Sequence, residues 1–457
     1  MNQIYEQIHS VMPVRLEGTV VRTDALTIAA ESFPAPIGAI ATIDRKDAVP
    51  LQAEVIAFHG DETVLYSYSD TTGIHRGSRI RLARTVPWLE VGDKLLGRVV
   101  NAFGKAIDRQ PQPILHNRVR YDRAAPAPCD RPPISEPLAT GIRAIDGLLT
   151  CGCGQRCGIF AGSGVGKSMT LGMMARYTSA DVNVIALIGE RGLEVNDFLT
   201  KVLGEQGRQK SVVVVATSDE PALMRVRAAS AAMSIAEYFR DQGKNVLFLM
   251  DSITRLAMAK RELGLAAGEP ATTKGYPPGV FSMLPRLLER AGRTNHGSIT
   301  GFFTVLVEGD DKQDPICDAV RGLLDGHIWL SRKLSTRNHY PAIDVLESIS
   351  RAMPKVCSEL MLQRAAEVRR LLGIYADHED LISIGAYHQG TNPEVDLALD
   401  MKSKIDHFLR QGVLEPSRPE ETQAMLENLI PLTGPDVTTP DAQERTGPPG
   451  TTGRSTD

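Results

Sequence analysis

The sequence predicts an α/β protein built in three parts: a small N-terminal β-barrel, a central mostly parallel sheet with helices, and a C-terminal α-helical domain. Short β-rich runs separated by Gly, Pro and Asp fill residues 14–85, which is typical of a small barrel. Within residues 86–354, apolar strands alternate with helical patterns, and this alternation indicates a mostly parallel sheet covered on both faces. Residues 355–432 are helical in pattern throughout.

Six short runs define the predicted barrel, and an irregular connector follows it. The connector covers residues 86–135 and ends in the Pro-rich stretch APAPCDRPP, which is typical of a link between domains. The predicted barrel strands are RLEGTVVRT, ALTIAAE, AIATI, LQAEVIAF, TVLYSY and SRIRLA.

Apolar runs bounded by turn residues define the central strands, and two longer amphipathic patterns define helices between them. The predicted strands cover residues 156–161, 182–189, 211–217, 245–251, 298–309 and 327–331. The helical patterns are EVNDFLTKVLGE and PALMRVRAASAAMSIAEYFRDQG.

The two ends of the chain differ from the rest. Residues 1–13 predict an amphipathic helix whose apolar stripe is Ile4, Ile8, Val11 and Met12. A short helix of this kind is marginal in water, so it either packs on its own domain or docks to a partner. Residues 433–457 consist of Thr, Pro, Gly and charged residues with little to bury, and they predict a disordered tail.

Composition excludes several classes of protein. The 457 residues carry 51 Lys and Arg against 55 Asp and Glu, a formal charge of −4, which disfavours a polycationic nucleic-acid binder. No apolar window approaches the roughly 18 residues that a membrane-spanning helix requires. The N-terminus lacks the basic start and apolar run of a secretory signal. We therefore expect a cytoplasmic protein.

The most informative segment is a Gly-rich loop between a predicted strand and a predicted helix. Its glycines allow successive backbone N–H groups to surround a phosphate, and the helix N-terminus adds a positive dipole end. Lys167 supplies a charge for the β- and γ-phosphates, and the Ser168 hydroxyl is a ligand for Mg²⁺. Ala161 occupies the position where the usual pattern begins with glycine. The candidate nucleotide-binding residues of the loop are Gly162, Ser163, Gly164, Val165, Gly166, Lys167, Ser168 and Met169.

Two carboxylates complete a candidate hydrolytic site. Asp251 ends the apolar strand NVLFLMD, which is the position of an acid that orders Mg²⁺ and its waters. A helix N-cap is the simpler interpretation of the same residue. Glu190 ends a neighbouring predicted strand, where a carboxylate can polarise the attacking water. Glu194 competes for that role, and a surface ion pair would explain Glu190 equally well.

Several motifs together resemble the catalytic subunits of the rotary ATPase superfamily over nearly the whole chain. The shared motifs are AGSGVGKS, IGERGLEV, LFLMDSITRLA, KGYPPGVF and HYPAIDVLESISRAMPKV. Within that superfamily, TGIRAIDGLLT, SISRAMP and DLISIGAYHQG resemble the flagellum-specific ATPases of the type III export apparatus, with injectisome ATPases as the nearest cousins. The region between Tyr375 and Asp396 lacks the acidic loop of ion-driven synthase subunits.

The resemblance implies a RecA-like ATPase domain in the centre and a homohexameric ring with ATP at the subunit interfaces. It assigns Lys167 and Ser168 to the phosphates and Mg²⁺, Glu190 to catalysis, and Asp251 to a water-mediated contact with Mg²⁺.

The resemblance also assigns residues outside the loop and its two acids. Arg351 matches the arginine that a neighbouring subunit extends toward the γ-phosphate, and Tyr340 matches the residue that stacks on adenine. Arg191 is expected near the phosphates or between subunits. Without the resemblance, an intramolecular ion pair with Glu347 is the simpler expectation for Arg351.

The implied partners follow from the same family. They are a regulatory stator-like protein at residues 1–13, a central stalk protein, the export gate, and export substrates with their chaperones. The protein is expected at the inner face of the cell membrane as a peripheral component, without nucleic acid. The turn Lys274–Val280, with two prolines and two glycines, is expected to be exposed and to line the central hole, with Tyr276 touching substrate or stalk. A helix-initiating loop is the alternative.

Other functions remain open at this level. They are an injectisome secretion ATPase, a catalytic subunit of an ion-driven synthase, an RNA translocase and a nucleotide-binding subunit without catalysis. The RNA translocase would need aromatic stacking surfaces in the barrel, and residues 14–84 offer only Phe33, Phe58, Tyr66 and Tyr68. The presence of the lysine and both acids argues against a non-catalytic subunit.

Overall fold

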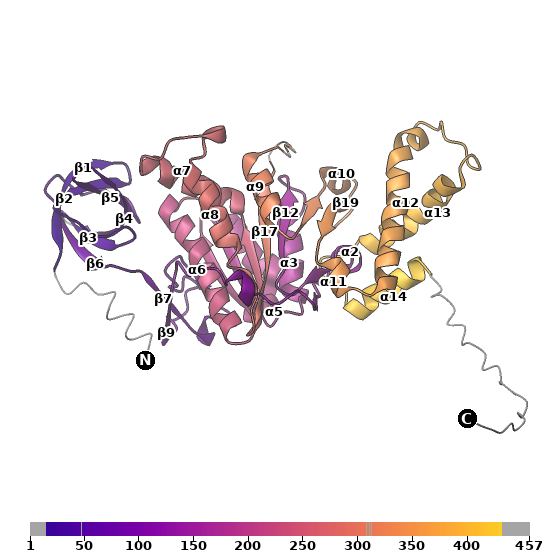
Figure 1. The fold of residues 1–457 in the computed structure, drawn as a ribbon, viewed down its shortest axis with the longest axis horizontal. Coiled ribbons are helices and arrows are strands. Elements are labelled where there is room, and N and C mark those ends of the chain that lie inside the picture. The colour runs from indigo at the N-terminus through magenta and orange to yellow at the C-terminus, as the bar shows by residue number, and fades with distance from the viewer. Residues whose placement is uncertain (1–14, 47, 308, 310, 312, 432–457) are drawn as a thin grey trace, which may run out of the picture.

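The protein is arranged as three parts in a row (Figure 1), as the sequence predicts. The computed structural model describes residues 15–431 except 47, 308, 310 and 312. A barrel lies at one end, a sheet covered by helices lies in the middle, and a group of helices lies at the other end. The predicted N-terminal helix (residues 1–13) and the predicted disordered tail (residues 433–457) lie outside the described residues.

All six predicted barrel strands are present, with bounds shifted by a few residues. They close in the order β1-β2-β5-β4-β3-β6, with every neighbouring pair antiparallel. Closure leaves no open sheet edge, and apolar side chains such as Ile28, Ile43 and Leu65 fill the interior. The strands are β1 (Glu17–Asp24), β2 (Thr27–Glu31), β3 (Ile40–Arg45), β4 (Ala48–His59), β5 (Glu62–Ser67) and β6 (Arg79–Arg84).

The predicted connector is more ordered than its sequence indicates. β7 (Trp88–Val91) and β9 (Asn117–Arg120) form a separate two-stranded antiparallel sheet. β8 (Val99–Val100) pairs in parallel with the edge of the central sheet. Strands of two to four residues are too short to show a hydrophobic period, so the sequence pattern does not reveal them. Single turns of 3₁₀ helix occur at Asp93–Leu95 and Pro128–Asp130.

The central sheet has the order β19-β18-β12-β17-β15-β13-β14-β8, and β16 pairs with β17. Six of these strands were predicted. β8 and β16 are only two residues long, and in β19 the consecutive exposed residues Leu346 and Glu347 interrupt the two-residue period, so these three were missed. The strands from β18 to β8 are parallel, whereas β19 and β16 run antiparallel to their neighbours. The bounds are β12 (Arg156–Ala161), β13 (Val182–Ile188), β14 (Ser211–Ala216), β15 (Asn245–Asp251), β16 (Gly292–Arg293), β17 (Ser298–Leu306), β18 (Gly326–Leu330) and β19 (Ile343–Ser350); β10 (Pro137–Leu138) and β11 (Cys151–Gly152) form a small separate pair.

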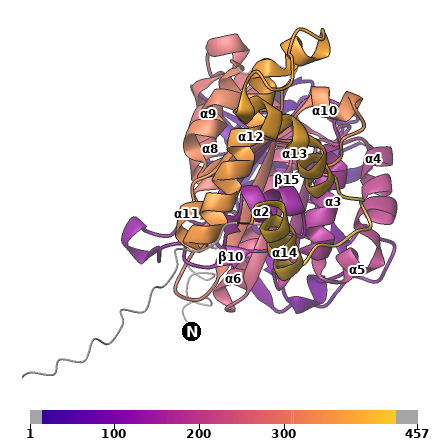
Figure 2. The same cartoon turned by 90° about the vertical axis from the view of Figure 1, so that its right-hand side faces the viewer.

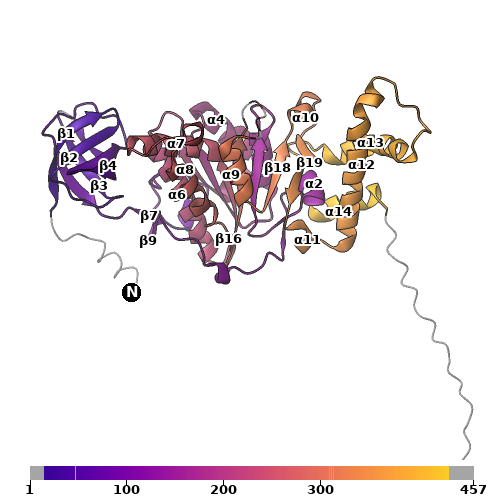
Figure 3. The ribbon, with the colours of Figure 1, turned by 45° about the horizontal axis from the view of Figure 1, so that its top comes forward.

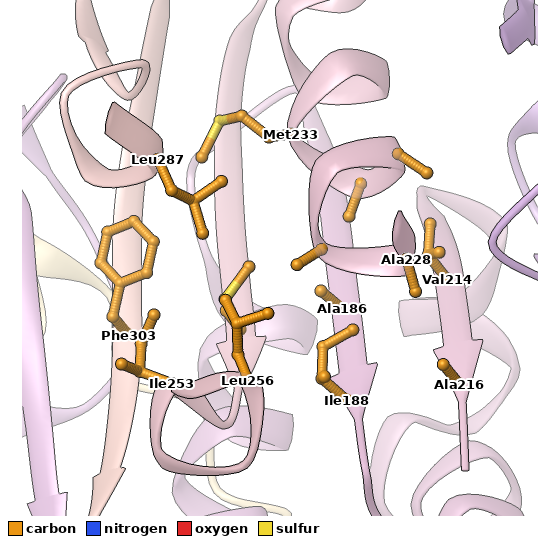
Figure 4. Packing of buried hydrophobic residues seen from close by; sticks show 14 of the residues in the cluster. Ala186, Ile188, Val214, Ala216, Ala228, Met233, Ile253, Leu256, Leu287 and Phe303 are labelled. Carbon is orange, nitrogen blue, oxygen red and sulfur yellow. The ribbon is translucent and has the colours of Figure 1, made fainter. Parts of the chain in front are cut away.

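Helices cover both faces of this sheet, and alternate side chains of each strand enter two separate cores. Ala186 and Val214 point toward α6, α7 and α8 (Figure 4), whereas Ile185 and Val213 belong to the core on the opposite face, with α2 and α3. The helices are α2 (Arg143–Leu148), α3 (Lys167–Tyr177), α4 (Gly192–Asp197), a π-helical turn (Phe198–Leu203), α5 (Gly204–Gln209), α6 (Ala222–Asp241), α7 (Ile253–Ala266), α8 (Pro278–Leu288), α9 (Pro315–Leu323), α10 (Arg332–Thr336) and α11 (Met353–Val356).

The C-terminal part consists of α12 (Glu359–Ser383), α13 (Pro393–Leu409) and α14 (Pro419–Leu429), and it confirms the predicted helical domain. Ser358 and Asn392 cap the first two helices through their side chains, as their residue types favour. Figures 2 and 3 show α12 beside α13, with α14 near α2. Among the described residues, no helix has the length and apolar character needed to cross a membrane.

A buried charge joins the barrel to the central part. Arg227 on α6 forms an ion pair with Glu54 on β4, and its guanidinium lies 4.8–5.6 Å from the ring centres of Tyr68, Phe103 and Tyr121. The Tyr68 hydroxyl donates to Glu54 Oε2 at 2.6 Å. Because a buried charge is stable only when paired and hydrogen-bonded, this cluster fixes the position of the barrel on α6.

Replacing Arg227 with Met is expected to lower the free energy of unfolding by about 3–5 kcal/mol, because Glu54 then stays buried without its cation. Urea unfolding followed by tryptophan fluorescence and circular dichroism measures the change. The matched control is Arg118→Met, which removes an exposed ion pair with Glu90 and is expected to cost less than about 1 kcal/mol. Equal losses in the two variants would contradict the role of the Arg227 cluster.

Candidate ATP-hydrolysing site

The Gly-rich loop joins the end of β12 to the start of α3 at Lys167, as the sequence predicts. Gly164 and Gly166 have φ values of 78° and 95°, a region that glycine adopts without strain. Ala161 is the buried last residue of β12, so the missing first glycine leaves the turn itself unchanged. Ser163 and Ser168 are exposed on the loop and the first helical turn, where backbone N–H groups and the helix dipole favour an anion.

Three side chains meet beside this loop because parallel strands end at the same edge of the sheet. Lys167 Nζ lies 2.5 Å from Asp251 Oδ1 and 3.6 Å from Glu190 Oε1. Asp251 ends β15, and Glu190 follows the neighbouring strand β13 by two residues. Thr304 on β17 donates to Asp251 Oδ1 at 2.8 Å, which fixes the carboxylate. The lysine and both acids chosen from the sequence therefore form one cluster.

Glu190 is buried in a setting that opposes its ionisation. Burial, a hydrogen bond with Glu194 and the charge of Asp251 raise the pKa of Glu190 to about 7, although the charges of Lys167 and Arg255 oppose this shift. A carboxyl group with a pKa near neutrality is suited to accept a proton under physiological conditions.

Glu194, the competing acid, has a different environment. Its side chain is half exposed and lies 3.5 Å from Arg191, and its hydrogen bond with Glu190 holds its pKa below the usual range. Arg191 is itself exposed at the start of α4, and its guanidinium forms an ion pair with Glu194. The geometry therefore favours Glu190 over Glu194 as the acid beside the phosphate loop, and it places the Arg191 side chain toward solvent.

The cluster fits a magnesium ion by the chemistry of its donors. Mg²⁺ prefers hard oxygen ligands and keeps several of its waters, so one carboxylate and one hydroxyl beside a phosphate site are a typical protein contribution. Asp251 supplies a buried carboxylate, and Ser168 supplies an exposed hydroxyl on the first turn of α3. Asp251 Oδ1 already accepts from two donors, which suits a contact to the ion through water.

Tyr340 lies against the phosphate loop from the side of the helical domain. A Cβ placed on Gly166 would lie 3.4 Å from Tyr340 Cε1, so the ring lies beside the loop. Tyr340 nevertheless remains 39% exposed. The Tyr340 carbonyl accepts from the backbone N–H of Gln411, just after α13. A half-exposed ring beside the loop is available for stacking, so its position agrees with a contact to the base of a nucleotide.

Arg351 lies at the end of the parallel strands opposite to the end where this cluster lies. Ala161 pairs with Leu330, and Leu330 pairs with Ile343 at the start of β19. β19 runs antiparallel to β18, and the Arg351 N–H donates to the carbonyl of Asp325, five residues before Leu330, so Arg351 lies about 16 Å farther along at roughly 3.3 Å per residue. An arginine side chain cannot span that distance to its own phosphate loop. The expected helical ion pair with Glu347 also does not arise, because this segment is a strand.

The structure adds two residues that sequence reasoning missed. Arg255 lies 3.3 Å from Glu190, and a Cβ on Gly189 would lie 3.1 Å from Arg255 Cβ, so a glycine allows this approach. Ser252 caps α7 by accepting from the Arg255 N–H, which directs the start of the helix at the cluster. Thr304 is the second missed residue. The sequence could have indicated Arg255, because it follows Asp251 closely in the motif DSITR. The position of Thr304 could not be predicted, because it depends on the register of β17 against β15.

One expectation about the Pro-rich turn is wrong. The sequence predicted an exposed turn at Lys274–Val280, but Tyr276 is buried, with its ring centre 6.2 Å from that of Phe281 and the Arg261 guanidinium over its face. Lys274 and Pro278 are the exposed residues of this segment, and Lys274 pairs with Asp311 at 3.0 Å. Pro278 begins α8, as the alternative proposed. Tyr276 therefore packs within its own protomer.

The chain matches two family descriptions and many relatives. Residues 141–350 match "ATP synthase alpha/beta family, nucleotide-binding domain", and residues 357–428 match "T3SS EscN ATPase C-terminal domain". A "Flagellum-specific ATP synthase" of Treponema pallidum is 51% identical over 92% of this chain and 94% of its own length; that of Bacillus subtilis is 49% identical over 90% and 94%. The assembled ATPase EscN from the enteropathogenic E. coli type III secretion system has a TM-score of 0.86 at 46% identity, over 90% of this chain and 99% of EscN.

These similarities show that the chain belongs to the ATP synthase alpha/beta family, and it is an ATPase. Within that family it belongs with the flagellum-specific ATPases, and the type III secretion ATPases are close relatives.

The raised pKa of Glu190 predicts how activity depends on pH. If the ionised carboxylate is required, kcat/KM rises with pH and levels off above a midpoint near 7. Glu190→Gln is expected to lower kcat by about 10²–10⁴-fold. Glu194→Ala removes a hydrogen bond that raises this pKa, so the midpoint should move to lower pH. Initial ATP hydrolysis rates at low ATP concentration measure the profile.

The control for this profile is Glu205→Ala, which removes an exposed acid on α5. It should leave the midpoint unchanged. A Glu194→Ala profile that coincides with the wild-type profile would contradict the coupling between Glu194 and Glu190.

Proposed function

We propose that this chain is the Mg-ATP-hydrolysing subunit of a homohexameric ring that energises protein export through the flagellar type III apparatus. The proposal depends above all on the meeting of Lys167, Glu190 and Asp251 beside the Gly-rich loop. The flagellum-specific enzymes described above are 51% and 49% identical over 92% and 90% of this chain, and they support the flagellar assignment. An injectisome function is the second candidate, because the SPI-2 type 3 secretion ATPase of Salmonella typhimurium is 51% identical over 80% of this chain.

Each residue of the site has a role that its environment supports. Lys167 and the N–H groups of residues 162–169 bind the phosphates, and Glu190 accepts a proton from the attacking water. Ser168 directly and Asp251 through water would hold Mg²⁺, which would neutralise charge on the phosphate oxygens. Thr304 and Arg255 orient the two carboxylates. Tyr340 stacks on the base.

Arg351 completes the site of a neighbouring protomer. It cannot reach its own phosphate loop, and within the described part of the chain its guanidinium has no ion-pair partner. A positive group that approaches the γ-phosphate stabilises the charge that spreads over it in the transition state, an effect of roughly 10³–10⁵ in rate in related enzymes. Activity then depends on assembly of the ring.

The assembly and its partners form the remaining part of the proposal. One relative structure is described as assembled EscN, and another as EscN in complex with its central stalk EscO. A ring with a central stalk protein is proposed here on that basis. The ring works at the inner face of the cell membrane, where it delivers substrates and their chaperones to an export gate.

The barrel offers little support for an RNA translocase. Among the four aromatic residues of the barrel, Phe58 is 48% exposed, whereas Phe33, Tyr66 and Tyr68 are buried, and both tyrosine hydroxyls donate to glutamates, Glu262 and Glu54 respectively. The ring faces of the three buried residues are not available for stacking on bases, which leaves a single exposed ring.

Replacing Arg351 with Ala is expected to lower kcat by about 10³-fold while ATP still binds, because the finger acts in the transition state. Steady-state hydrolysis and the binding of a fluorescent ATP analogue separate the two effects. Arg321→Ala is the matched control, since both arginines act on the pKa of the His327 side chain and so lie in the same region. The control should keep its activity; a fully active Arg351→Ala enzyme would refute the shared site.

Deleting residues 1–13 tests the proposed contact with a stator-like partner. Hydrolysis should persist, while co-purification with that partner is lost, because the apolar stripe is removed. A chain that lacks residues 433–457 serves as the control for truncation and should retain the partner. If the chain without residues 1–13 fails to fold, the stripe instead packs on its own domain.

A further inference from the structure

A buried hydrogen-bond cluster holds the base of the Arg351 segment. The Gln155 side chain is fully buried, and its Nε2 donates to Ser350 Oγ at 3.1 Å and to the Asp325 carbonyl at 3.2 Å. The same carbonyl accepts the backbone N–H of Arg351 at 3.0 Å. The Ser350 hydroxyl donates in turn to the Thr150 carbonyl at 2.8 Å. The Gln155 amide therefore contacts Ser350, the residue before Arg351, and also the Asp325 carbonyl that binds the Arg351 backbone.

Asp325 is held equally firmly from the other side. Its carboxylate accepts two parallel hydrogen bonds from the Arg156 guanidinium, each 3.0 Å long, and a third from the Arg156 backbone at 3.1 Å. Bidentate pairs of this kind fix geometry as well as energy. Arg156 is the first residue of β12, the strand that ends at the phosphate loop. The cluster thus connects one end of this strand to Arg351.

The space around Gln155 leaves no room for a shift. A Cβ on Gly326 would lie 2.6 Å from the Ile349 carbonyl and 3.0 Å from Gln155 Nε2. Because the packing around Gly326 is already close without a side chain there, the Gln155 amide has a single arrangement available. Loss of its donors would leave the Asp325 carbonyl and the Ser350 hydroxyl with fewer partners and free the strand end to move.

We propose that Gln155 is a positioning residue for Arg351, and that it acts on the active site of the neighbouring protomer rather than on its own. The inference rests on the proposed function of Arg351 as a finger that crosses the subunit interface. Gln155 touches no reacting group; it sets the position of the strand end that carries the finger. A displacement of about 1 Å at a catalytic group costs roughly 10² in rate, so this position matters.

Gln155→Leu removes the amide and is expected to lower single-turnover ATP hydrolysis by assembled rings about 10²-fold, with ATP binding unchanged. Gln155→Glu is the second variant. It keeps an acceptor for the Gly152 N–H and loses both donated hydrogen bonds, so it should lower the rate about 10²-fold as well. This variant replaces Gln155→Leu in the test if Gln155→Leu does not fold. Size-exclusion chromatography confirms that each variant assembles.

Mixed rings distinguish action on the neighbour from a general structural defect. Gln155→Leu chains are co-assembled with an equal amount of Lys167→Ala chains, whose own site is inactive but whose Arg351 segment is intact. A Gln155→Leu site beside a Lys167→Ala neighbour then receives a well-placed finger, and single-turnover hydrolysis should rise about tenfold or more above that of Gln155→Leu alone. Single-turnover conditions prevent an inactive neighbouring site from hiding the recovery.

Asn183→Leu is the matched control. Asn183 is also a fully buried amide, and its Nδ2 donates to the Ala175 carbonyl at 2.7 Å and to Ser211 Oγ at 3.1 Å. It lies on β13, away from Arg351, so any loss of rate comes from its own protomer. Co-assembly with Lys167→Ala should give no recovery.

The outcomes separate this inference from the proposed function. Full hydrolysis by Gln155→Leu, or a loss that Lys167→Ala chains do not restore, would overturn the positioning role. Arg351→Ala chains mixed in the same way test the finger itself. If Arg351→Ala recovers and Gln155→Leu does not, only the positioning role fails; if neither recovers, the shared active site fails with it.

Discussion

The parallel pairing of β12, β17, β15 and β13 is the constraint on which the site depends. Parallel strands bring their carboxyl ends to one edge, so the loop after β12, the acid that ends β15 and the acid after β13 meet without long loops. Lys167 lies between the two carboxylates as their shared counter-ion. Removing this charge would leave two buried acids facing each other, which is the arrangement that burial penalises most.

The same sheet separates Arg351 from the phosphate loop of its own protomer. β18 is parallel to β12, but β19 runs antiparallel to β18. Arg351, which follows β19, therefore lies at the end of the strands away from the phosphate loop. One protomer therefore holds the acids and the loop at one end of the parallel strands and Arg351, the proposed finger, at the other. In the proposed ring of identical subunits, head-to-tail contacts would place the second end of each chain against the first end of the next.

The sequence predicted most of the architecture because its strongest signals are local. Fully apolar strands such as Val182–Ile188 bury both faces, and the Gly-rich loop is readable from spacing alone. Edge strand β19 interrupts its two-residue period at Leu346 and Glu347 and was missed. The position of Thr304 beside Asp251, and the burial of Tyr276, depend on register and on packing between distant segments. Neither property is encoded in the spacing of residues within one motif.

The two ends of β12 connect the phosphate loop to the backbone of Arg351. Its carboxyl end opens the phosphate loop, and its first residue clamps Asp325, whose carbonyl holds the Arg351 backbone. A strand in the middle of a sheet is held on both sides and transmits displacement along its length with little bending. β12 is therefore a direct packed connection between the phosphate loop and the backbone of Arg351, the residue proposed to serve the next site.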